Sequence, residues 1–261
     1  MRFGCCVSTP EQIAVLAEAG YDFCELPAAT VRPFEADESA LPALRSLAAA
    51  PLRAESFNVL VPPQLALVGP QADREALRSY LRRAFGRMAQ LGGAVAVLGS
   101  GGARRIPDGM PRDLALDQLA ESLVLAADEA GRAGIELALE PLNRNECNVF
   151  ATLSECRAFV RDRALDQVRL LADLYHIEIE REPLDEVVAA GPLLVHVHVA
   201  GGGRGAPDIP GYDYDGFMAA LATAGYDRRI SAECAWDDLA AQAPGALAAM
   251  RERWEQHARK Q

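Results

Sequence analysis

The chain has 261 residues and a formal net charge of −11, with 26 lysines and arginines against 37 aspartates and glutamates. Half of the residues are hydrophobic and 24% are charged, which is typical of a globular enzyme. The acidic balance argues against a nucleic-acid partner, because phosphate neutralisation needs clustered lysine and arginine. No stretch approaches the ~18 consecutive apolar residues of a membrane span, so we also expect no membrane partner.

The amino-terminal segment lacks the long apolar run of a signal peptide. The six cysteines show neither C-x-x-C pairs nor disulfide-like spacing. Both observations predict a cytoplasmic protein with reduced thiols.

Short apolar runs typical of strands alternate with longer amphipathic segments along the whole chain. The expected strands cover residues 3–7, 22–26, 53–60, 94–98, 135–140, 168–173, 193–199 and 230–234. The expected helices cover residues 10–19, 39–49, 74–91, 112–133, 152–163, 183–189, 217–224 and from 237 or 238 to the end. Thr9-Pro10 and Asp73 are helix-start signals, and Gly20 is a helix-stop signal.

Eight strand–helix units of about 30 residues each predict a single (β/α)8 TIM barrel over residues 1–261. A doubly wound open sheet is the competing architecture. Its dinucleotide-binding form is not supported, because no G-x-G-x-x-G follows the first strand.

Reactive groups of such barrels gather where the strands end. The last four expected strands end near Glu140, Asp173, His198 and Glu233, which are 33, 25 and 35 residues apart. Each acid alone also fits a helix cap or an ion pair. Together, three carboxylates would repel one another in a cleft, and a divalent cation removes that conflict. Oxygen ligands with one imidazole favour Mn²⁺, Mg²⁺ or Co²⁺.

Other polar residues surround these four. Asn143 and Glu146 follow Glu140 in a loop suited to substrate hydroxyls, and His176 lies three residues after Asp173. Glu25, Glu55 and Asn58 lie in the second and third expected strands and are further candidates to line the pocket.

Four motifs resemble those of the sugar isomerase/epimerase barrels, a xylose isomerase-like group that includes ketose 3-epimerases and hydroxypyruvate isomerases. They are Leu-Glu-Pro-Leu-Asn-Arg-x-Glu at 139–146, Asp-x-x-His at 173–176, His-x-His with an arginine six residues later, and Ser-Ala-Glu-Cys at 231–234. The resemblance implies a metal held by Glu140, Asp173, His198 and Glu233, with Glu140 and Glu233 also acting as acid and base.

The same resemblance implies that Glu146, His176 and Arg204 contact the substrate near its carbonyl group. It also implies that His196 contacts the metal ligands and does not itself bind the metal. The partner would be a small sugar, and many such barrels form homo-oligomers. The implied reaction removes a proton from the carbon beside a metal-bound carbonyl and returns it through an enediolate.

These motifs do not identify the substrate. The run Ala200-Gly201-Gly202-Gly203 before Arg204 departs from the polar residues typical of ketose 3-epimerases. Its amides suit a carboxylate or phosphate, and a flexible lid explains the glycines equally well. A hydroxypyruvate isomerase, an inosose dehydratase-like lyase and a barrel that binds a sugar acid without turnover are the alternatives. An abasic-site endonuclease fits poorly, since it needs more histidines and a basic face.

Overall fold

Eight parallel strands close into a barrel, in which each strand pairs with the next and β8 pairs with β1. The structure is a computed structural model that describes residues 1–258. The predicted TIM-barrel fold is confirmed. The strands are β1 (Arg2–Cys6), β2 (Phe23–Pro27), β3 (Ala54–Asn58), β4 (Val95–Leu98), β5 (Glu136–Leu139), β6 (Val168–Asp173), β7 (Leu194–Val199) and β8 (Arg229–Ala232).

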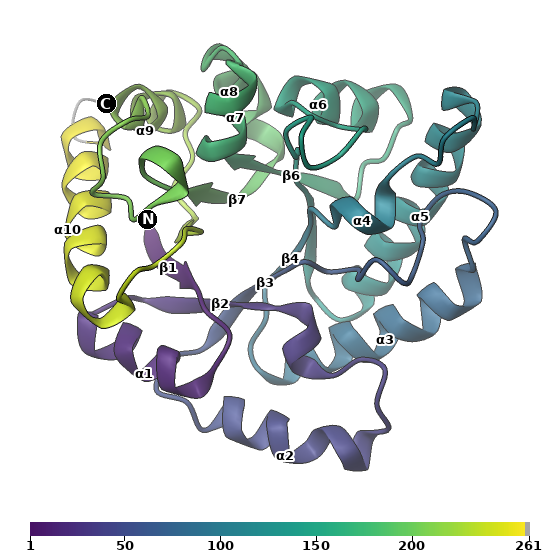
Figure 1. The fold of residues 1–261 in the computed structure, drawn as a ribbon, viewed down its shortest axis with the longest axis horizontal. Coiled ribbons are helices and arrows are strands. Elements are labelled where there is room, and N and C mark those ends of the chain that lie inside the picture. Colours follow the sequence, from purple (N-terminus) through teal and green to yellow (C-terminus); the bar gives the residue numbers. More distant parts are fainter. Residues whose placement is uncertain (259–261) are drawn as a thin grey trace.

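Helices surround the strands, and the last helix lies beside the first, which completes the outer ring (Figure 1). The α-helices are α1 (Pro10–Ala19), α2 (Asp37–Ala48), α3 (Arg74–Gln90), α4 (Gly101–Arg104), α5 (Arg112–Arg132), α6 (Leu153–Asp162), α7 (Leu174–Glu180), α8 (Asp185–Ala190), α9 (Tyr214–Thr223) and α10 (Leu239–Ala258). Short 3₁₀ turns lie at Ala28–Val31, Gly191–Leu193 and Gly202–Arg204. Within residues 1–258 no helix is long and apolar enough to cross a membrane.

Helix ends follow local sequence chemistry. The Thr9 hydroxyl accepts from the Gln12 amide while the Gln12 side chain accepts from the Thr9 amide, a capping box that starts α1. Gly20, at a φ of 90°, ends the same helix in the left-handed conformation that glycine adopts without strain. Asp73 accepts from two amides at the start of α3. These three signals were predicted correctly.

Two short helices were not predicted. Helix α4 follows β4 directly in the glycine-rich segment, and α7 begins at the residue after Asp173. The expected helix at 183–189 is α8, which begins two residues later, at Asp185. The two missed helices matter because α4 carries Arg104 and α7 carries His176.

The barrel interior changes from apolar to polar towards the carboxyl ends of the strands. Its lower part is a cluster of small and branched side chains: Val95, Val97, Ala138, Leu171 and Val195. Above it, Asp173 pairs in register with His198 and His198 with Ser231, while Cys6 pairs with Glu25 on the other side. Register therefore places the predicted site residues of different strands in one layer.

Candidate active site and metal centre

Glu140, Asp173, His198 and Glu233 converge at the carboxyl end of the barrel. One potential ligand atom from each residue lies within 4.8 Å of those of the other three. Ligands on opposite sides of a cation at 2.0–2.6 Å would be about 4–5 Å apart, so these atoms are spaced as around one ion. The carboxylate oxygen Oδ2 of Asp173 is buried without a hydrogen-bond partner. This donor set fits a divalent metal.

Glu25 fixes the orientation of His198. Its Oε1 lies 2.9 Å from His198 Nε2, and its Oε2 lies 2.6 Å from His196 Nε2. A carboxylate only accepts, so Nε2 of each imidazole carries the proton. Nδ1 of His198 then faces Glu140 Oε1 at 3.0 Å and Glu233 Oε2 at 3.6 Å. His198 thus presents Nδ1 to the other candidate ligands, and His196 contacts the second oxygen of the same Glu25 carboxylate.

Burial and the mutual repulsion of the carboxylates dominate the electrostatics of the cluster. Burial, then repulsion from Glu233, raises the pKa of Asp173 to about 8, and burial also raises the pKa of Glu140. Burial alone would lower the pKa of His198, but the carboxylates of Glu25 and Glu233 hold it well above its usual range. A divalent cation would replace these protons as the positive charge that the carboxylates need.

Metal loading should stabilise the fold. At a Mn²⁺ concentration of 100 times Kd, we expect about 2.7 kcal/mol of stabilisation, which for a domain of this size raises Tm by roughly 5–11 °C. Differential scanning fluorimetry with Mn²⁺ or EDTA measures this shift. Asp173→Asn is the control and should reduce it. An equal Tm with and without Mn²⁺ would contradict the metal centre.

Glu140 is fitted tightly into the wall of the barrel. A Cβ on Gly99 would overlap with Glu140 Oε2, so the carboxylate occupies the space that a side chain at position 99 would fill. From α4 the guanidinium of Arg104, fully buried, donates to the main-chain carbonyls of Leu98 and Glu140, at 3.2 Å and 2.7 Å. The space left by Gly99 and the hydrogen bond from Arg104 to the Glu140 carbonyl thus fix the position of Glu140.

The substitution Gly99→Ala should therefore displace Glu140. We expect the affinity for Mn²⁺ to fall by about 10–100-fold, the effect of losing a group that orients a ligand. Isothermal titration with Mn²⁺ measures it. Gly86→Ala is the matched control, because an added Cβ there meets nothing within 4 Å and Mn²⁺ affinity should not change. Unchanged affinity in Gly99→Ala would show that Glu140 does not ligate.

Glu233 is the most accessible acid of the cluster. Its side chain is 19% exposed, against 6% for Glu140 and 2% for Asp173. Asn58 donates to its Oε1 at 3.1 Å and Arg204 donates to its Oε2 at 2.8 Å. A molecule entering the barrel mouth therefore meets Glu233 before the other carboxylates.

His176, Asn143 and Glu146 form a second group beside the ligands. The main-chain and side-chain amides of Asn143 both lie within 3.1 Å of His176 Nδ1, and the side chain also donates to Glu146 Oε1. Nδ1 accepts, so the proton of His176 is on Nε2, 3.5 Å from Asp173 Oδ2. Burial lowers the pKa of His176 to about 3, which keeps the ring neutral. Asn143 is itself buried and positions the other two side chains.

Arg204 connects this group to the ligands. Its guanidinium lies 3.3 Å from Glu146 Oε1 and 2.8 Å from Glu233 Oε2, and it stacks over the Tyr175 ring at 4.4 Å. The carbonyl of Arg204 accepts from the amide of Ala235, which joins the loops after β7 and β8. The predicted substrate residues thus lie together around the candidate metal centre.

The glycine loop before Arg204 is folded on itself. The amides of Gly201, Gly202 and Gly205 donate to the carbonyls of Gly205, Ile209 and Gly202. A Cβ on Gly201 or Gly202 would overlap with the carbonyls of Ala206 or Pro210. Close packing is therefore the reason for Gly201 and Gly202, and the amides of both, which belong to the run expected to suit an anion, are occupied.

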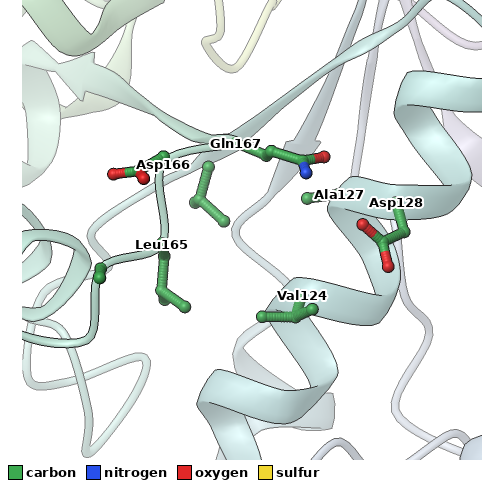
Figure 2. A pocket seen from close by; sticks show the side chains of 8 residues that line it. Val124, Ala127, Asp128, Leu165, Asp166 and Gln167 are labelled. Atoms are coloured by element: carbon green, nitrogen blue, oxygen red, sulfur yellow. The ribbon is translucent and has the colours of Figure 1, made fainter.

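Two features lie away from the site. Glu55 is at the start of β3 and pairs with Arg2 and Arg229, so its expected place at the barrel mouth is wrong. A pocket of about 210 Å³ lies between α5 and the loop that leads into β6, at the opposite end of that strand from Asp173 (Figure 2). Neither belongs to the ligand cluster.

Glu25 and Asn58 contact site residues, as described above, although sequence position alone did not distinguish them from Glu55.

Comparison with known proteins points to one family. The family model described as xylose isomerase-like TIM barrel matches residues 13–256. Among curated proteins, the ketose 3-epimerase of Arthrobacter globiformis is 29% identical over 217 residues, covering 80% of this chain and 72% of that protein. The 3-dehydro-D-guloside 4-epimerase of Escherichia coli is 31% identical over 119 residues, or 44% of this chain. That match spans less than half of the Escherichia coli protein, 45% of its length.

Among solved structures, the D-psicose 3-epimerase of Clostridium cellulolyticum H10 with D-tagatose superposes with a TM-score of 0.84 at 20% identity. The superposition covers 97% of this chain and 99% of that one. At this identity the likeness supports the fold. The names of the curated relatives support the expectation of an isomerase-class enzyme.

Proposed function

Because the chain belongs to the xylose isomerase-like TIM barrel family, we propose that it is a divalent-metal-dependent enzyme that epimerises or isomerises a sugar. The observation that carries this proposal is the convergence of Glu140, Asp173, His198 and Glu233 within 4.8 Å of one another. Mn²⁺, with Mg²⁺ or Co²⁺ as the other hard cations, suits three carboxylates and one imidazole.

The proton-transfer groups are Glu233 and Glu140. When bound, the cation would polarise the substrate carbonyl and stabilise the negative charge that develops as the neighbouring carbon loses its proton. Glu233, the more exposed acid, removes the proton, and Glu140, in its protonated form, delivers a proton to the opposite face of the same carbon for epimerisation. Glu233 then loses its proton to solvent and Glu140 regains one from solvent. Delivery of a proton to the carbonyl carbon instead gives isomerisation between ketose and aldose.

The substrate carbonyl end is held by His176, Arg204 and Glu146. The neutral His176 offers Nε2–H as a donor, and Arg204 offers its guanidinium at the edge of Glu233. Glu146, which is 35% exposed, accepts from sugar hydroxyls. The three residues lie in the segments that follow β5, β6 and β7.

We propose a free ketose as the substrate, with 3-epimerisation as the reaction. Arg204 is already balanced by two carboxylates, and three amides of the glycine loop are occupied, which leaves little to bind a phosphate. The Arthrobacter globiformis relative is named as a ketose 3-epimerase and matches 80% of the chain, which agrees with this choice.

Proton NMR in D₂O tests the proposal. Mn²⁺-loaded protein is incubated with free ketoses, ketose phosphates, hydroxypyruvate and a keto-inositol. We expect deuterium at C3 of a free ketose, together with its C3 epimer. Exchange in hydroxypyruvate, or loss of water from the keto-inositol, would assign the site to the isomerase or the lyase alternative. Absence of exchange in every compound, despite bound Mn²⁺, would refute the proposal and favour a binding protein.

A further inference from the structure

Cys6 lies at the edge of the ligand cluster and has no part in the function proposed above. It is the last residue of β1, in register with Glu25, and the residue as a whole is of intermediate exposure. A potential ligand atom of Cys6 lies within 4.8 Å of those of His198 and Glu233. The group of Cys6, His198 and Glu233 therefore has two residues in common with the four-residue cluster, His198 and Glu233.

Asn58 orients the Cys6 sulfur toward this shared edge. Its side-chain amide lies 3.5 Å from Cys6 Sγ and 3.1 Å from Glu233 Oε1, so one group serves both potential ligands. The amide donates to the sulfur and so holds it beside Glu233. Asn58 Oδ1, by contrast, is buried without a hydrogen-bond partner.

Cys6 differs from the other thiols of the chain. Cys5, Cys24, Cys147 and Cys156 are buried, and Cys234 is the second partly exposed cysteine. Within residues 1–258, Cys6 is the one cysteine that occurs in a group of three or more potential ligands. A reactive nucleophile is not indicated, because burial and the carboxylates of Glu25 and Glu233 raise the pKa of the Cys6 thiol well above its usual range.

We propose that Cys6, His198 and Glu233 form a second, softer metal site that takes thiophilic divalent cations such as Zn²⁺ or Cd²⁺. Sulfur, nitrogen and oxygen ligands with one open position are a zinc-type set, whereas Mn²⁺ prefers the oxygen-rich set with Glu140 and Asp173. As the metal–sulfur bond forms, the thiol proton leaves to solvent. Because the two sets share Glu233, a cation held by Cys6 would compete with Mn²⁺ and withdraw this carboxylate from catalysis. The inference rests on the proposed metal centre.

Cd²⁺ titration of the metal-free protein tests the inference, with the near-ultraviolet charge-transfer absorption of a cadmium–thiolate bond as readout. We expect this band in the wild type and in Cys234→Ser, and its loss in Cys6→Ser and Cys6→Ala. Removal of Cys6 should lower Zn²⁺ affinity by at least about 10-fold, since loss of a group that only orients a ligand already costs that much, and leave Mn²⁺ affinity within about 3-fold.

The outcomes separate the two proposals. A band that persists in Cys6→Ser, or that disappears in Cys234→Ser, would overturn the assignment of the sulfur ligand. The wild type could bind Mn²⁺, as seen by electron paramagnetic resonance, and yet show no cadmium–thiolate band. That result would refute the soft site and leave the proposed function intact. Failure of the folded wild type to bind either metal would refute both.

Discussion

Replacing Glu233 by glutamine is expected to abolish proton exchange at the substrate carbon while the barrel stays folded. Glutamine keeps the size of the side chain and an oxygen that can still ligate, but it cannot accept the proton. A general acid–base group contributes about 10²–10⁴-fold to the rate, and we expect kcat to fall by that factor. The rate of deuterium incorporation at saturating Mn²⁺ measures the effect.

A control variant separates the two proposed roles of Glu233, metal binding and proton transfer. Asp173→Asn alters another candidate ligand, which is buried and has no assigned role in proton transfer. At a Mn²⁺ concentration that fills both variants, as monitored by electron paramagnetic resonance, Asp173→Asn should keep more of the exchange rate than Glu233→Gln. Equal residual rates would contradict the assignment of Glu233 as the base and leave it as a ligand alone.

The four candidate ligands could be predicted from sequence because the barrel repeats. Each strand–helix unit returns the chain to the same end of the barrel, so residues at successive strand ends must meet there. This reasoning needs only the positions of Glu140, Asp173, His198 and Glu233 relative to strand ends, and the structure brings these residues together. Their roles as ligands remain a proposal that metal titration tests.

Contacts across the barrel could not be predicted in the same way. Glu25 reaches His196 and His198, 171 and 173 residues away, and no local pattern encodes a partner on the far side of a barrel. Glu55 failed for a different reason. The strand was expected over residues 53–60, and this range did not show whether the Glu55 side chain reaches the barrel mouth. In the structure Glu55 lies near the amino end of β3, away from the carboxyl end that forms the mouth. Helix α7 was missed because it has only seven residues and begins directly after the candidate ligand Asp173.

Glu25→Gln is expected to weaken metal binding, although Glu25 is not one of the four candidate ligands. Both oxygens of Glu25 accept from imidazole Nε2–H groups, and a glutamine has only one oxygen. Its NH₂ group would face one of the imidazoles and favour the tautomer with the proton on Nδ1. In His198 that nitrogen faces the ligand cluster, so proton and metal would compete for it.

We expect Mn²⁺ affinity to fall by about 10–100-fold and the free energy of unfolding of the metal-free protein to fall by about 3–5 kcal/mol, the cost of breaking a buried charged pair. Calorimetric titration and urea unfolding measure the two effects. Glu55→Gln is the matched control, because Glu55, like Glu25, pairs with two side chains, in this case Arg2 and Arg229 at the other end of the barrel. It should lower stability without changing Mn²⁺ affinity. If both variants lost metal affinity equally, general destabilisation would explain the loss, and the positioning role of Glu25 would be refuted.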